Sequence, residues 1–226
     1  MAIQLRKGET INLTMEAPTL NKIRVGLGWD AGITGHGPQS PWRKVAQTIN
    51  NFFVRLGWAA GSTGDGPKSP CYLDLDAYCF LLNAQGKCRD ERDMVFYQSA
   101  NRNHFEGAVA QNDYDLFGDG DDESIKVQLD KVNANIERLV FVVSIYAAPQ
   151  RKQTFGMVKN AFIRLINEET GEELCRADLS DQFSVETSLN FAELYRLNGE
   201  WNFKIVSQGY QAGLEKFVSD FGLQLT

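Results

Sequence analysis

Alternation of apolar and polar residues is the feature that most limits how this chain can fold. In the stretch SIKVQLD, the side chains of Ile125, Val127 and Leu129 fall on one side and polar side chains lie between them. This period of two is typical of a half-buried strand. The stretch RLVFVVSIYAA, residues 138–148, is nearly continuous in apolar residues, as expected of a strand buried on both faces. Strands are therefore expected to make up most of the chain.

Turn and helix signals complete the expected fold. Asn198 and Gly199 lie between two alternating runs and favour a tight hairpin, because both residue types tolerate a positive φ. Near the C-terminus, apolar residues recur at helical spacing from Leu214 to Phe221, and Gly222 follows as a stop signal. Many strands, a C-terminal helix and few short helices predict a mainly β fold, a β-sandwich of two sheets.

Length and charge narrow the class of protein. The chain has 226 residues, of which 43% are hydrophobic, and no linker-like stretch divides it, so residues 1–226 are expected to form a single domain. A net charge of −6 argues against binding to nucleic acid or to anionic membranes. The first residues lack the apolar region of a signal peptide, and no stretch is long enough to span a bilayer. We therefore expect a cytoplasmic protein without direct membrane insertion.

The chain contains a tandem duplication. Residues 17–41 and 46–70 are identical at 15 of 25 positions at a constant offset. Two copies are too few for a solenoid, so a duplicated strand and loop is the simpler interpretation. Either copy could form the same strand of a sheet, because the two sequences are so similar. We expect residues 20–30 to hold that position, with an inserted duplicated segment at about 31–70.

The second copy contains GSTGDGPKS, which has some features of a phosphate-binding loop. Pro67, however, separates Gly66 from Lys68, and the segment that follows reads as a strand where a phosphate loop needs a helix. The first copy has Gln39 in place of the lysine. A flexible turn is favoured over a nucleotide site.

Acidic residues are most concentrated in the segment 112–123, which reads NDYDLFGDGDDE. Crowded carboxylates repel one another unless they stay solvated or a cation neutralises them. Oxygen ligands alone favour Ca²⁺ over Mg²⁺, which prefers few protein ligands. An EF-hand is excluded, because two of its ligand positions would fall on Phe117 and Ser124. A solvated acidic loop remains the alternative.

Two further carboxylates lie on the stretch YLDLDAY. Asp74 and Asp76 share one face of this expected strand, and its apolar residues share the other. Two carboxylates on one face are costly unless they are solvated or bind something. We expect this face to lie near the acidic loop, and a metal site shared by the strand and the loop is a hypothesis.

Several motifs resemble one protein family along the whole chain. LRKGETINLT, VGLGWDA, DLDAYCFLLN, GDGDDE, RKQTFGMVKNAFIRLIN and FAELYRLNGEWNFKIVSQGYQAGL occur in this order. They resemble the TerD family of bacterial tellurium-resistance and stress-response proteins. The family has one GLGWDA strand and a shorter loop before DLDA, so residues 31–70 depart from its pattern.

The resemblance implies a β-sandwich that binds calcium through the DLDA strand and the GDDE loop. The ligand candidates that match by motif are Asp74, Asp76, Asn112, Asp113, Asp119, Asp121, Asp122 and Glu123. The Asn-Asp pair at 112 and 113 stands where the family has these residues in the other order. Asp30 matches the aspartate of GWDA, whereas the second copy has Ala59.

The function expected from these features is that of a non-enzymatic calcium-binding protein of the tellurite and general stress response. Its expected partners are other stress-response or tellurium-resistance proteins, and its oligomeric state is left open. The alternative is a metal-dependent phosphoester hydrolase that uses the same carboxylates, with Arg151 and Lys152 as a weak phosphate clamp. Handling of tellurite by thiols is less favoured, because the four cysteines form no CxxC pair, and the same spacing argues against zinc.

Overall fold

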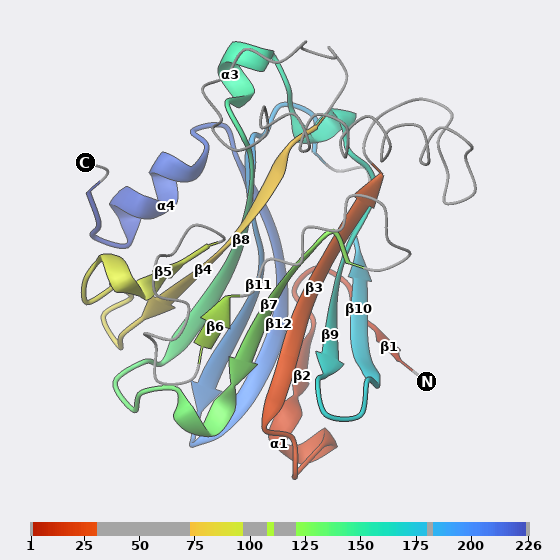
Figure 1. Cartoon of the computed structure of the whole chain (residues 1–226), viewed down its shortest axis with the longest axis vertical. Coiled ribbons are helices and arrows are strands. Elements are labelled where there is room, and N and C mark those ends of the chain that lie inside the picture. The colour runs from red at the N-terminus through yellow and green to blue at the C-terminus, as the bar shows by residue number, and fades with distance from the viewer. Residues whose placement is uncertain (1, 31–72, 97–107, 111–120, 180–182, 225–226) are drawn as a thin grey trace, which may run out of the picture.

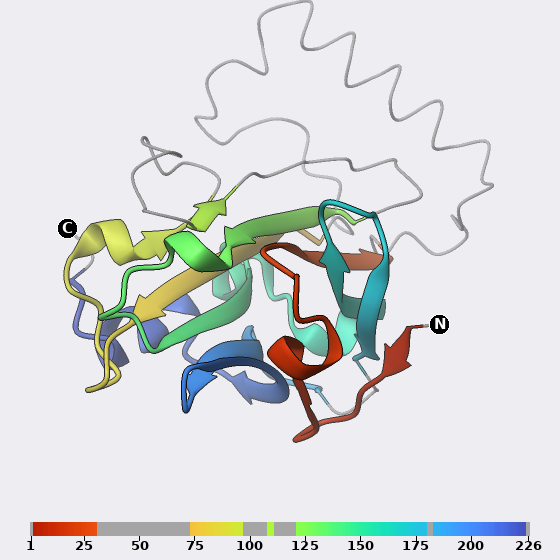
Figure 2. The same ribbon diagram turned by 90° about the horizontal axis from the view of Figure 1, so that it is seen from below.

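The fold of the chain is a sandwich of two β-sheets. The computed structural model describes residues 2–30, 73–96, 108–110, 121–179 and 183–224. Within these residues the strands form two six-stranded sheets, here called sheet A and sheet B (Figure 1). The view along the strands shows the two layers (Figure 2). The predicted mainly β, two-sheet sandwich is confirmed.

Sheet A has the strand order β1-β10-β9-β3-β7-β6. Its neighbouring strands are antiparallel except for β1, which runs parallel to β10. The strands are β1 (Ile3–Gln4), β3 (Lys22–Asp30), β6 (Ala108–Ala110), β7 (Glu123–Gln128), β9 (Lys159–Asn167) and β10 (Glu173–Asp178).

Sheet B has the order β2-β12-β11-β8-β4-β5 and is antiparallel throughout. The strands are β2 (Thr10–Asn12), β4 (Leu75–Leu82), β5 (Met94–Val95), β8 (Arg138–Ile145), β11 (Ser188–Leu197) and β12 (Glu200–Tyr210). β11 and β12 form the predicted hairpin, in which Asn198 and Gly199 have φ angles of 53° and 83°. Both turn residues have positive φ, as a type I′ turn requires.

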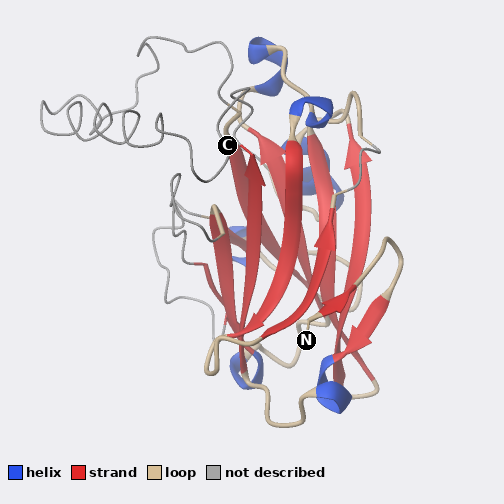
Figure 3. Cartoon of the chain, turned by 90° about the vertical axis from the view of Figure 1, so that its right-hand side faces the viewer, coloured by secondary structure: helices blue, strands red, loops and turns tan. Residues whose placement is uncertain are grey.

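The short helical segments are α1 (Leu13–Glu16), η1 (Glu91–Asp93), η2 (Leu129–Lys131), α3 (Ala148–Arg151) and η3 (Phe155–Met157). Of these segments, α3 and η3 lie toward one end of the sandwich and α1 and η2 toward the other (Figure 3). The sequence predicts a strand that includes Leu129. In the structure β7 ends at Gln128 and Leu129 begins η2, but its side chain is buried as expected. Among the residues placed by the structure, no helix is long and apolar enough to cross a membrane.

The main core lies between the two sheets and follows the period of two. Ile23, Val25 and Leu27 of β3 point inward, as do Ile125 and Val127 of β7. These side chains are at most 2% exposed. Burial of apolar surface of this kind contributes about 25 cal/mol per Å².

A second apolar cluster covers the outer face of sheet B. The C-terminal helix α4 (Leu214–Asp220) packs Phe217 and Val218 against Phe80 of β4 and Val142 of β8. Both strands are therefore buried on both faces along this part, as the continuous apolar sequence of β8 predicts. Gly222, with φ at 82°, follows the helix, in agreement with the predicted stop.

The first copy of the repeat occupies the sheet. β3 lies between β9 and β7 and pairs with both, which confirms that residues 20–30 hold the strand position. The inserted segment at about 31–70 lies outside the described residues. The single-domain organisation therefore stays a prediction.

Candidate functional site

The structure describes five of the eight predicted metal ligands, and they lie in two groups. Asp74 and Asp76 lie at the start of β4 in sheet B. Asp121, Asp122 and Glu123 lie at the start of β7 in sheet A. The remaining candidates, Asn112, Asp113 and Asp119, lie outside the described residues.

Asp74 and Asp76 point away from the core, as the alternation predicts. Their neighbours Leu75 and Ala77 belong to the core between the sheets, so the two carboxylates lie on the outer side of sheet B. Arg151 approaches Asp74, with 3.7 Å between Nη1 and Oδ2. The Tyr78 hydroxyl lies 3.4 Å from Oδ2 of Asp76, which is a long hydrogen bond.

Both carboxyl groups have a raised pKa in this environment. Burial raises the pKa of Asp74, and the charge of Arg151 opposes the rise. Burial raises the pKa of Asp76 to about 6, with a further contribution from the charge of Asp74, while the Tyr78 hydroxyl lowers it. The charge of a cation bound between the two would offset both the burial and the repulsion, because it stabilises the ionised carboxylates.

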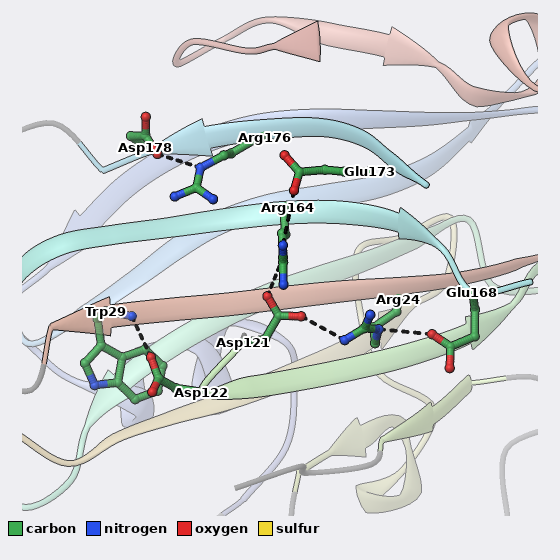
Figure 4. A network of polar contacts seen from close by, with 9 residues as sticks. All are labelled: Arg24, Trp29, Asp121, Asp122, Arg164, Glu168, Glu173, Arg176 and Asp178. Atoms are coloured by element: carbon green, nitrogen blue, oxygen red, sulfur yellow. Dashed lines mark hydrogen bonds and ion pairs between the residues drawn. The ribbon is translucent and has the colours of Figure 1, made fainter. Parts of the chain in front are cut away.

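Asp121 is held by two arginines on the outer face of sheet A (Figure 4). Its Oδ2 accepts from Arg24 Nη1 at 3.0 Å, and its Oδ1 accepts from Arg164 Nε at 2.6 Å. Arg24 points outward, because it alternates along β3 with the inward Ile23 and Val25. Arg164 of β9 is the cross-strand partner of Gly26. The Asp121 side chain is only 3% exposed.

Gly26 makes room for this carboxylate. A Cβ atom at position 26 would lie 2.2 Å from the carboxylate carbon of Asp121, closer than real Cβ atoms approach other heavy atoms. A glycine inside a strand often marks such a close approach. Gly26, Arg24 and Arg164 therefore form a seat for Asp121, here called the Asp121 seat.

Further ion pairs extend the seat across the sheet. Arg24 also bonds Glu168 at 3.0 Å, and Arg164 bonds Glu173 at 3.2 Å. Lys126 of β7 pairs with Glu168 as well. The network thus contains three positive side chains and three carboxylates, so its charges balance.

Asp122 and Glu123 tie the end of the acidic loop to both sheets. Oδ2 of Asp122 accepts from the backbone N–H of Trp29 at 2.7 Å, and its own N–H donates to Leu27 O at 2.7 Å. Glu123 is 2% exposed and accepts a hydrogen bond from the backbone N–H of Ala77. Since Ala77 belongs to β4, this bond joins sheet A to sheet B.

The position of Glu123 has a local cause. It pairs with the inward Leu27, so its side chain points between the sheets. The edge strand β5 pairs only with Cys79 and Phe80 of β4, and the N–H of Ala77 lies beyond its end. Glu123 satisfies this buried donor, which would otherwise carry a desolvation cost.

The described carboxylates do not form a complete metal site by themselves. In the ranges that the structure covers, no group of three or more His, Cys, Asp or Glu side chains is placed to share one ion. Both oxygens of Asp121 are already engaged by arginines. Asp74 and Asp76 retain the oxygen donors that a hard cation prefers. The predicted ligand set as a whole stays a prediction.

The described thiols are in unreactive surroundings. Cys79, Cys88 and Cys175 are free, and Cys79 and Cys175 are buried. Burial raises the pKa of Cys88 and of Cys175 to about 12. Because the thiolate is the reactive form, these groups are poor nucleophiles at neutral pH.

Sequence reasoning missed Arg24, Arg164 and Gly26. Two signals were available: a glycine inside an alternating strand, and single arginines at outward positions of β3 and β9. The pairing of these positions depends on the order of strands in sheet A, which the sequence pattern leaves open.

Comparisons with known proteins agree on one family. The model of the TerD domain matches residues 1–41 and 35–221. The chain is 40% identical over 227 residues to General stress protein 16U of Bacillus subtilis (strain 168), with 100% of each chain covered. It is 37% identical over 225 residues to Tellurium resistance protein TerD of Serratia marcescens, covering 99% of this chain and 98% of that protein.

A solved structure shares the fold. The homologue of telluride resistance protein (TerD), SCO6318, from Streptomyces coelicolor A3(2) superposes with a TM-score of 0.53 at 17% identity, covering 91% of this chain and 99% of that one. This structure supports the fold, while the family model and the two relatives show the family. The chain belongs to the TerD family of tellurium-resistance and general stress-response proteins.

Proposed function

We propose that this protein is a non-enzymatic calcium-binding protein of the tellurite and general stress response. The observation that carries the proposal is the pair Asp74 and Asp76. Two half-buried carboxylates share the outer side of one strand, and Arg151, at 3.7 Å from Asp74, is the one arginine or lysine paired with them within the described chain. A divalent cation with oxygen preference would neutralise the pair.

The remaining ligands would come from the acidic loop. Calcium takes six to eight oxygens, so two aspartates are not enough. Glu123 binds the N–H of Ala77, which directly follows Asp76, and this bond fixes the end of the loop close to the strand. Asp119 lies four residues before Glu123, a stretch that can reach at most about 14 Å when extended. Asp119, Asp113 and Asn112 are therefore the candidates to complete the site.

In this proposal the three acidic residues at the start of β7 differ in role. Asp121 anchors the loop through Arg24 and Arg164. Asp122 anchors it through the backbone N–H of Trp29, and Glu123 through that of Ala77. These anchors would hold the loop ready to bind, and Asp74 and Asp76 would supply oxygens. Calcium would then stabilise the form that binds it, by about 2.7 kcal/mol at one hundred times its Kd.

The cellular setting belongs to the same proposal. The relatives are named for general stress and tellurium resistance. We place the protein in the cytoplasm, with other stress-response or tellurium-resistance proteins as its partners. Calcium would act by favouring the partner-competent form.

Isothermal titration calorimetry with Ca²⁺ and then Mg²⁺ tests the proposal. The wild type is expected to bind Ca²⁺ in preference to Mg²⁺, and the Asp74→Asn/Asp76→Asn variant is expected to lose binding. Asp178→Asn is the matched control, because this exposed carboxylate pairs with Arg176 on β10 of sheet A, whereas β4 belongs to sheet B. A wild type that binds no calcium would overturn the proposal. Hydrolysis of a phosphate ester with Mg²⁺, lost on Asp76→Asn, would favour the hydrolase instead.

A further inference from the structure

The repeat provides two segments for one position in sheet A. Residues 22–30 form β3, and residues 51–59 are their equivalents in the second copy. Three inward side chains are the same in both, because Val25, Leu27 and Trp29 recur in the second copy at the same spacing. Most of the interior packing therefore does not distinguish the copies.

The outward side chains do distinguish them. Where β3 has Arg24, the second copy has Phe53, and where β3 has Gly26, it has Arg55. Phe53 in this position could not bond Oδ2 of Asp121, which now accepts from Arg24 at 3.0 Å. Any side chain in place of Gly26 would bring its Cβ to 2.2–2.3 Å from the three carboxylate atoms of Asp121.

The other close glycine of β3 does not separate the copies. A Cβ on Gly28 would lie 2.4 Å from the ring of Phe162, but the second copy also has glycine there, at position 57. Lys22, replaced by Asn51 in the second copy, makes only an exposed ion pair with Glu169 at 3.4 Å. The two segments differ at five positions, and the differences at 24 and 26 are those that meet the Asp121 carboxylate. The other three are Lys22 to Asn51, Ile23 to Phe52 in the interior, and Asp30 to Ala59 at the end of the strand.

We propose that the Asp121 seat selects which repeat copy enters sheet A. It admits a strand with arginine and glycine at the positions of Arg24 and Gly26, and it excludes a strand with phenylalanine and arginine there. Asp121 would then have a role in specifying the fold that is independent of calcium. With this selection, the chain can contain a second segment similar to β3 and still place only β3 between β9 and β7.

Hydrogen exchange of the full chain, read by mass spectrometry, tests this selection. Peptides from the two copies differ in mass, so the protection of residues 22–30 and 51–59 can be followed separately. The variant Arg24→Phe/Gly26→Arg/Phe53→Arg/Arg55→Gly exchanges the outward residues between copies. We expect the amides of 22–30 to exchange faster by about tenfold or more, and those of 51–59 to gain protection.

Three further variants make the result interpretable. Lys22→Asn imports a second-copy residue outside the seat and should leave the pattern unchanged. Phe53→Arg/Arg55→Gly leaves β3 intact and should give 51–59 partial protection, so the test does not depend on the fourfold variant folding. Unchanged protection in the fourfold variant would overturn the proposal. So would an equal shift caused by Ile23→Phe alone, because selection would then lie in the core.

Discussion

Replacement of Gly26 by alanine offers a test in which the sign of the effect is informative. Alanine inside a strand normally stabilises a protein relative to glycine, by about 0.5–1 kcal/mol. At this position the new methyl group would lie 2.2 Å from the Asp121 carboxylate carbon, well inside the contact distance of about 3.5–4.0 Å. Asp121 would have to leave its seat, so we expect alanine to destabilise.

The magnitude follows from what Asp121 loses. Breaking a fully buried ion pair costs about 3–5 kcal/mol. The side chains of Arg24 and Arg164 are 28% and 22% exposed, so water would recover part of this, and we take about 2–3 kcal/mol. After subtraction of the normal gain from alanine, the expected net loss is about 1–2 kcal/mol.

Urea denaturation of four proteins measures the effect. They are the wild type, Gly26→Ala, Asp121→Ala and the double variant. Without the Asp121 carboxylate the methyl group has space, so Gly26→Ala should be neutral or stabilising in the Asp121→Ala background. The reasoning would be refuted if Gly26→Ala were as stable as the wild type, or if its cost were the same in both backgrounds.

Three other features give separate expectations. Glu123→Ala should lower the free energy of unfolding by about 1–3 kcal/mol, because the buried N–H of Ala77 loses its acceptor, and Glu123→Gln, which keeps an acceptor oxygen, should lose less. The pKa of Cys88 is raised from 9.0 to about 12, so in a Cys71→Ser variant its alkylation rate should still rise with pH above about pH 9; a plateau there would contradict the raised pKa. Gly199→Val should cost about 1–2 kcal/mol in urea denaturation, since φ is 83° at this turn position, and an unchanged midpoint would argue against the turn geometry.

Local patterns were enough to predict most of the fold. The alternation around Val127, the apolar run that begins at 138 and the Asn198 turn each act within a few residues, and each appears in the structure. The strand predicted over 138–148 ends at Ile145, and Ala148 begins α3. The same alternation placed Asp74 and Asp76 on one face, opposite Leu75 and Ala77. Period and turn chemistry are properties of short segments, and a sequence displays them directly.

The Asp121 seat could not be predicted in this way. Arg24 and Asp121 are 97 residues apart in sequence, and Arg164 is 43 residues beyond Asp121. Only the strand order of sheet A brings them together. The sequence showed the carboxylates of the acidic loop, and it predicted solvent or a cation as their partners. For Asp121 the structure shows two arginines in that role.

The outer faces of the two sheets are held by different forces, and this gives the sandwich an uneven response to ionic conditions. Sheet B is covered by the apolar side of α4, whose burial strengthens in sulfate or phosphate salts. On sheet A, the part-buried pair of Arg24 with Glu168 and the more exposed pair of Arg176 with Asp178 weaken as added salt screens them. Rising salt would therefore tighten one side of the molecule while it loosens the periphery of the other.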